Sequence, residues 1–229
     1  MILVRSVLFF LWFAVAPTLM AILFLPVLVS RRATRWLSRS WARVTLWGLR
    51  VLAGIDFTVR GTPPRAPVLV AAKHMSMWDT LALWLMLDDP GIVLKRELLR
   101  VPFYGWYLAR AAAIPIDRGA GASALRKMRQ AAQAMLAKGR PILIFPEGTR
   151  KKPGAAPDYK PGVAGLYGQL EVACVPVALD SGVYWTGFRK KPGTITLQFL
   201  EPIPPGLKRA EFMATLETRI ETAVAALLP

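Results

Sequence analysis

After residue 54 the sequence alternates between short apolar runs and longer amphipathic ones, and this alternation constrains the fold more than any other feature. Short apolar runs are typical of buried strands, and the amphipathic runs between them are typical of helices that cover a sheet. The pattern therefore predicts an α/β domain with a mainly parallel sheet flanked by helices. In such a sheet, ligands bind beyond the carboxyl ends of the strands.

The apolar runs predict strands at residues 56–60, 67–72, 91–95, 112–116, 141–145, 174–179 and 194–200. Helices are expected at residues 77–87, 98–110, 122–138, 162–170 and 210–227, with a long loop at residues 153–161. Cys174, the single cysteine, lies inside one of the apolar runs, so we expect a buried structural thiol.

No charged residue occurs from Ser6 to Val29, a length that exceeds the roughly 20 apolar residues a membrane-spanning helix needs. A signal peptide is the competing interpretation, because Arg5 precedes the run and residues 14–16 resemble a small-residue cleavage site. The apolar run continues past that site, and Pro17 would directly follow the cut. We therefore expect a permanent anchor, which either crosses the bilayer or enters one leaflet.

The next segment, to about Ala53, repeats arginine at positions 35, 39 and 43 among several tryptophans. This pattern predicts an amphipathic helix whose arginines lie in the lipid headgroup layer. The alternative is an ordinary amphipathic helix packed on the protein core. We expect two domains: membrane-associating helices at residues 1–54, and an α/β domain at residues 55–229. The arginines that follow the apolar segment place this domain on the cytoplasmic face, at the inner membrane in a bacterium.

The chain carries 30 Lys and Arg against 14 Asp and Glu, a formal net charge of +16 that favours acidic partners. Anionic membrane lipids, a phosphorylated substrate and an acidic carrier protein all qualify. We do not expect nucleic acid, because the aromatic residues concentrate in the membrane segment and no nucleic-acid motif occurs. One histidine without a cysteine pair gives poor support for a metal site.

His74, the only histidine, follows the strand at residues 67–72, and Asp79 comes five positions later. If a helix begins between them, Asp79 can bend back to the ring and leave the other ring nitrogen free to accept a proton from a substrate hydroxyl. The alternative is a helix-entry histidine satisfied locally, and the spacing alone does not decide. Ser76 lies outside any strained nucleophile turn, so we expect it to take no part and no covalent intermediate to form.

Arg118 and Arg150 follow two other predicted strands, so parallel pairing would bring both to the same crevice as His74. Guanidinium groups bind phosphate oxygens in a bidentate way, which predicts an anion clamp. Gly148 lets the backbone approach a ligand closely, and Thr149 offers a hydroxyl. The alternative is that both arginines are solvated surface charges.

Four ordered blocks resemble the glycerolipid acyltransferases, specifically the 1-acyl-sn-glycerol-3-phosphate acyltransferase group. They are His74 with Asp79, Ile116-Asp117-Arg118, Phe145-Pro146-Glu147-Gly148-Thr149-Arg150 and Val175-Pro176-Val177, and the resemblance covers residues 66–179. It implies that His74, oriented by Asp79, deprotonates the sn-2 hydroxyl of lysophosphatidic acid. That hydroxyl then attacks the thioester of acyl-CoA or acyl carrier protein and gives phosphatidic acid without a cofactor.

The same resemblance implies that Arg118 and Arg150 hold the phosphate and that Glu147 positions the glycerol. It further implies that Lys95 matches a lysine near the phosphate site. Three departures from the family pattern bear on which lysolipid is accepted: Lys73 in place of Asn, and Ala112 and Pro115 in place of Gly and Phe. One alternative function is acylation of another lysolipid, such as a lyso-ornithine lipid or a lysophospholipid with a larger headgroup. A second is a non-enzymatic, basic, membrane-tethered binding protein.

Overall fold

The computed structural model describes residues 1–111, 113–117 and 121–229, apart from the side chain of Ala122. Its central element is a 7-stranded sheet in the order β1-β9-β6-β2-β5-β3-β4. Among these neighbours only β6 and β9 are antiparallel, so the predicted mainly parallel sheet is confirmed. The strands are β1 (Ile55–Arg60), β2 (Leu69–Ala72), β3 (Gly91–Lys95), β4 (Ala113–Ile116), β5 (Ile142–Ile144), β6 (Cys174–Leu179) and β9 (Gly193–Phe199).

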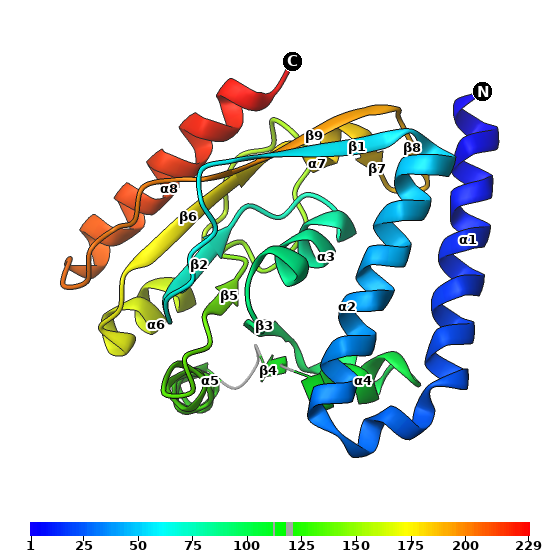
Figure 1. Cartoon of the computed structure of the whole chain (residues 1–229). Coiled ribbons are helices and arrows are strands. Elements are labelled where there is room, and N and C mark those ends of the chain that lie inside the picture. The colour runs from blue at the N-terminus through cyan, green and yellow to red at the C-terminus, as the bar shows by residue number, and fades with distance from the viewer. Residues whose placement is uncertain (112, 118–120) are drawn as a thin grey trace.

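Helices cover both faces of the sheet, as predicted. Helices α5 (Gly121–Leu136), α6 (Gly162–Leu170) and α8 (Arg209–Leu227) lie on one face, and α3 (Met77–Met86) and α4 (Tyr104–Ala111) lie on the other with the N-terminal helices (Figure 1). Strands β2 and β6 are buried along their whole length, which explains why both read as continuous apolar runs. Cys174 is fully buried as predicted, and burial raises the pKa of its thiol far above the usual range.

The predicted helix at residues 98–110 is wrong in its first half, whereas α4 (Tyr104–Ala111) confirms its second half. The chain forms a short 3-10 helix, η3 (Arg96–Arg100), breaks, and then begins α4 at Tyr104. Pro102 lacks a backbone N–H, and Phe103 adopts a φ of 60°, so an uninterrupted helix cannot pass through them. Pro115, one of the departures from the family pattern, lies in β4. This is an edge strand of the sheet, where a residue without a backbone N–H is tolerated.

Three short elements were not predicted: α7 (Ser181–Tyr184), β7 (Trp185–Thr186) and β8 (Arg189–Lys190). Each has at most four residues, too few to show a period in the sequence. The strands β7 and β8 form an antiparallel hairpin at one end of the molecule.

The N-terminal segment forms a helical hairpin, α1 (Ile2–Leu23), η1 (Leu25–Val29) and α2 (Arg31–Gly48), which continues into a π-helical turn, η2 (Leu49–Ala53). Helix α1 is long and apolar enough to cross a membrane by length and composition, and only 11% of its most apolar window is buried. It nevertheless contacts the rest of the protein along its length. The Phe9 ring lies 5.3 Å from that of Trp185, Trp12 donates to the Val44 carbonyl at 3.2 Å, and Tyr107 donates to the Ala21 carbonyl at 2.9 Å.

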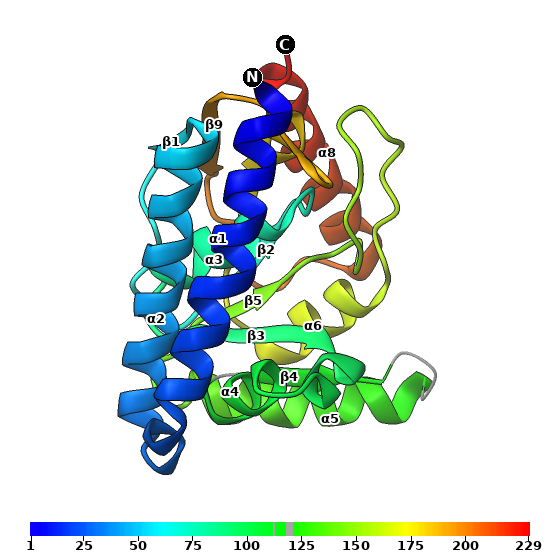
Figure 2. The same cartoon turned by 90° about the vertical axis from the view of Figure 1, so that its right-hand side faces the viewer.

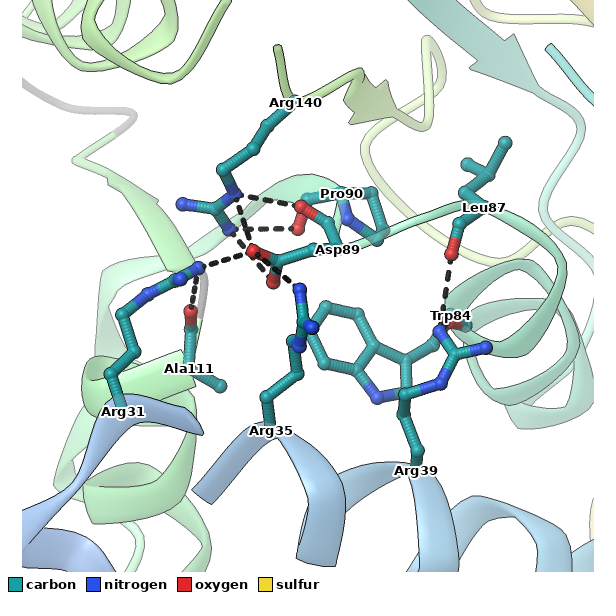
Figure 3. Close-up of polar contacts among 9 residues, drawn as sticks. All are labelled: Arg31, Arg35, Arg39, Trp84, Leu87, Asp89, Pro90, Ala111 and Arg140. Atoms are coloured by element: carbon teal, nitrogen blue, oxygen red, sulfur yellow. Dashed lines mark hydrogen bonds and ion pairs between the residues drawn. The ribbon is translucent and has the colours of Figure 1, made fainter. Parts of the chain in front are cut away.

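Two arginines of α2 face the α/β domain rather than lipid headgroups (Figure 3). Arg39 donates to the carbonyls of Trp84 at 3.0 Å and Leu85 at 2.8 Å, at the end of α3 where helical carbonyls lack helical partners. Arg35 forms an ion pair with Asp89 at 3.3 Å. The predicted headgroup position is therefore wrong for both, and the alternative of a helix packed on the core holds for this face of α2.

Asp89 is buried at the centre of a cluster of three arginines (Figure 3). Its Oδ2 lies 2.7 Å from Arg31, 3.3 Å from Arg35 and 3.1 Å from Arg140. Arg31 and Arg35 come from α2, whereas Arg140 follows α5, and burial lowers the pKa of Arg140. One carboxylate thus joins the N-terminal hairpin to two elements of the α/β domain.

We predict that Asp89→Asn lowers the free energy of unfolding by about 2–3 kcal/mol, because it leaves the buried Arg140 beside two further cations without an anion. Asp56→Asn is the matched control, since it removes the same charge from an exposed pair with Arg50 and is expected to cost at most about 1 kcal/mol. Urea unfolding in detergent micelles, followed by circular dichroism, measures both. Equal losses in the two variants would contradict the role assigned to Asp89.

Candidate active site

A cavity of about 1300 Å³ lies at the carboxyl ends of the central strands. Strands β2, β3, β4 and β5 are mutually parallel, so the residues that follow them reach the same edge of the sheet. Arg118 lies outside the described residues, but Asp117 directly before it lines the cavity. The predicted residues that line the same cavity are His74, Lys95, Glu147, Gly148, Thr149 and Arg150.

His74 and Asp79 meet as the sequence predicted. Ser76 caps α3 at its N-terminus, and this places Asp79 in the first turn, below the loop that carries His74. Nδ1 of His74 lies 2.9 Å from Oδ2 of Asp79, and the His74 side chain is 12% exposed. An ionised carboxylate can only accept hydrogen bonds, so in the neutral ring Nδ1 carries the proton and Nε2 keeps a lone pair.

Asp79 is fully buried, and both of its carboxylate oxygens accept hydrogen bonds. The backbone N–H groups of Met75 and Ser76 donate to Oδ2 at 2.7 Å and 2.9 Å. The Ser76 hydroxyl lies 3.1 Å from Oδ1, and the Ser181 hydroxyl donates to the same oxygen. These donors stabilise the charged carboxylate and hold it in one orientation.

The sequence does not indicate that Ser76 and Ser181 contact Asp79. Ser76, expected to take no part, caps α3 and contacts Asp79, so it is a positioning residue. The sequence analysis gives Ser181 no role, although this residue lies two residues after the end of β6, which is parallel to β2. Its position after a parallel strand was the signal that could have indicated it, because that end of the sheet carries the site.

Phe145 contacts the His74 ring, and the loop after Phe145 contacts the His74 backbone. The two rings stack with centroids 4.0 Å apart and planes 22° apart. The N–H of Lys151 donates to the carbonyl of His74 at 2.8 Å. The block at residues 145–150 thus contacts His74 directly, which explains why the two motifs form one wall of the cavity.

Lys73 and Glu147, which lines the cavity, form a buried ion pair. Nζ of Lys73 lies 3.1 Å from Oε1 of Glu147 and 2.7 Å from Oε1 of Glu221, which lies on α8. Tyr159 donates to the same Glu221 oxygen at 2.8 Å. Burial raises the pKa of Glu147, and the hydrogen bond from Lys73 opposes that rise. Sequence reasoning noted Lys73 only as a departure from a family pattern and missed this pairing.

Gly148 adopts a φ of 65°, a conformation that favours glycine, and its N–H donates to the Phe145 carbonyl at 2.9 Å. The glycine is therefore required by the turn itself. Beyond the turn, Arg150 and Lys95 are exposed at the cavity, and Lys95 lies 3.6 Å from Glu97. Both cations can reach an anion that enters from solvent.

The match to a family model defines the class of this α/β protein. Residues 56–180 match the model described as Acyltransferase, and the chain belongs to this family of enzymes. The chain is 37% identical over 199 residues to a 1-acyl-sn-glycerol-3-phosphate acyltransferase of Pseudomonas aeruginosa, covering 84% of this chain and 77% of the relative. It is 31% identical over 216 residues to a lyso-ornithine lipid O-acyltransferase of the same organism, covering 85% and 79%.

The fold is also shared with a solved structure. The crystal structure of the 1-acyl-sn-glycerophosphate acyltransferase PlsC from Thermotoga maritima matches with a TM-score of 0.81 and 20% identity, covering 99% of this chain and 98% of that one. The coverage includes the N-terminal hairpin, so the hairpin and the α/β domain together form the shared fold.

We predict that Lys73→Met lowers the free energy of unfolding by about 3 kcal/mol, because two carboxylates would face each other without a cation in a buried site. Lys160→Met is the control, since its pair with Asp158 is exposed and contributes little to stability. Denaturant titration at neutral pH measures both variants. A loss for Lys73→Met no greater than the control would show that the buried pair does not stabilise the cavity wall.

Proposed function

We propose that the protein transfers a fatty acyl group from acyl-CoA or acyl carrier protein to the sn-2 hydroxyl of 1-acyl-glycerol-3-phosphate. The product is phosphatidic acid. The single observation that carries this proposal is the His74 ring, held by Asp79 at the wall of a large cavity that also presents Arg150 and Lys95. The similarity at 37% identity to an acyltransferase named for this acceptor supports the choice of substrate.

The chemistry requires one base and no covalent intermediate. Nε2 of His74 takes the proton of the sn-2 hydroxyl as its oxygen attacks the thioester carbonyl. The carbon–sulfur bond breaks, and the imidazolium returns the proton to the departing thiolate. Asp79 stabilises the imidazolium in between, because its carboxylate already accepts from Nδ1 at 2.9 Å.

The acceptor phosphate is held by cations at the cavity. Arg150 follows the turn at Gly148, and Lys95 ends β3, so both extend from rigid parts of the fold. Arg118 is proposed as a third phosphate ligand, because it directly follows the cavity residue Asp117. Glu147 already accepts from the buried Lys73, so we propose that it acts mainly by fixing the block that carries Thr149 and Arg150.

The helical hairpin keeps this site at the membrane. Helix α1 exposes apolar side chains along its length and contacts the α/β domain from Phe9 to Ala21. A helix so held lies beside the domain, which favours insertion into one leaflet over a full crossing. The arginines at the start of α2 favour the cytoplasmic face, where anionic lipids lie near the cavity.

Acylation of a lyso-ornithine lipid is the second candidate, supported by the 31% identity to an acyltransferase of that name. The cations at the cavity favour the phosphorylated acceptor. Arg150 and Lys95 attract a phosphate dianion more strongly than an ornithine headgroup, which carries one carboxylate and one ammonium group and so has no net charge.

An assay of acyl transfer to a panel of lysolipids tests the proposal. We expect the purified enzyme in mixed micelles to acylate lysophosphatidic acid from a thioester donor, and His74→Gln to lower kcat by about 10³-fold through loss of the base. Ser181→Ala is expected to lower kcat by about tenfold with little change in KM, because Asp79 would lose one of its fixed donors.

Ser123→Ala, at an exposed position of α5, is the matched control and should leave the rate unchanged. Full turnover by His74→Gln would refute the assignment of the base. Acylation of lyso-ornithine lipid with none of lysophosphatidic acid would establish the second candidate instead.

A further inference from the structure

The segment from Lys95 to Arg110 presents an apolar surface that the proposed chemistry does not use. It comprises the end of β3, the 3-10 helix η3, the break at Pro102 and helix α4. Three of its large apolar side chains are exposed: Leu98 by 39%, Val101 by 43% and Trp106 by 49%. The Phe103 ring packs 5.2 Å from that of Trp106, and Phe103 lines the same cavity as Leu98 and Val101, so these exposed groups lie on the same part of the molecule. Grouped exposed apolar side chains mark contact surfaces.

Basic side chains surround this patch. Lys95, Arg96, Arg100 and Arg110 are all exposed, against one acidic residue of the segment, Glu97. Lys95 lies 3.6 Å from Glu97 and Arg96 lies 3.5 Å from Asp117, which leaves the segment with a positive excess. Tryptophan and aliphatic side chains beside arginines are typical of protein surfaces that lie at the boundary between lipid headgroups and acyl chains.

The 95–110 segment also adjoins the apolar helix α1. Tyr107 donates to the Ala21 carbonyl near the end of α1 at 2.9 Å, and Arg110 donates to the Val29 carbonyl of η1 at 2.7 Å. Figure 2 looks onto α1 and shows α4 beside the end of that helix. The exposed patch therefore continues the surface through which α1 contacts lipid.

The 95–110 segment and helix α1 line the same cavity. The 95–110 segment contributes Leu98, Val101 and Tyr107 to its lining, and α1 contributes Phe13 and Pro17. A bilayer that contacts both would lie directly against the cavity wall, so an acceptor lysolipid could enter without leaving the lipid phase. Trp106 does not line the cavity, so its exposed ring has no role inside it.

We propose that the 95–110 segment is a second membrane-contacting element, with Trp106, Leu98 and Val101 at the acyl-chain boundary and Arg96 and Arg100 against lipid phosphates. Its partner is a bilayer that contains anionic phospholipid. This inference rests on the membrane association given under the proposed function, and it extends the contact from the hairpin into the α/β domain.

A fluorescent probe on a single introduced cysteine tests the contact. The full chain has one native cysteine, Cys174, which is fully buried, so Trp106→Cys can be labelled selectively with a nitrobenzoxadiazole probe. The protein is reconstituted into phosphatidylcholine vesicles with phosphatidylglycerol and with lipids that carry a nitroxide near the headgroup. Leu11→Cys on α1 is the positive control, and Ala214→Cys on α8, on the opposite side of the sheet (Figure 1), is the negative control.

We expect the nitroxide to quench the Trp106 probe as strongly as the Leu11 probe, and aqueous iodide to quench it far less than the Ala214 probe. A Trp106 probe that behaves like the Ala214 probe would overturn the proposal. Leu98→Cys, also exposed, repeats the test should the first label disturb folding. The readout is contact with lipid, so an inactive protein with a quenched probe would refute the proposed function alone.

Discussion

The Asp79 carboxylate is the interaction on which the site depends. It is fully buried, and it accepts hydrogen bonds from His74, from the backbone at Met75 and Ser76, and from the Ser181 hydroxyl. These donors come from the loop after β2, the N-cap of α3 and the first residue of α7. One anion therefore joins three elements of the sheet edge and sets the tautomer of the histidine at the same time.

The N-terminal hairpin, proposed above to associate with the membrane, also takes part in this arrangement. Helix α3 is fixed at its start by the Ser76 cap and at its end by Arg39 of α2, which binds the last carbonyls. The Asp89 cluster fixes the chain directly after α3. Side chains of α1 and α2, such as Phe9 and Leu46, belong to the same hydrophobic core as the sheet. The N-terminal hairpin and α3 are thus parts of one packed unit.

Sequence reasoning predicted the sheet and the meeting of His74 with Asp79, because continuous apolar runs and a helix-start pattern are local signals. It failed where the outcome depends on tertiary partners. Arg39 reads as a headgroup arginine until the end of α3 is placed against it. Lys73 reads only as a departure from the family pattern until Glu221, 148 residues away, supplies its second carboxylate. The break at Phe103 and the role of Ser181 likewise depend on positions that no period in the sequence encodes.

The most direct test of this account is the nitrogen NMR spectrum of the protein labelled with ¹⁵N-histidine, because His74 is the only histidine and its two ring nitrogens give unambiguous signals. We predict that at pH 8 Nδ1 is protonated and Nε2 is not. In Asp79→Asn this preference should weaken or reverse, since the side-chain amide offers donors where the carboxylate only accepts. An Nε2-protonated ring in the unmodified protein would contradict the claim that Asp79 prepares His74 to take a proton from the acceptor hydroxyl.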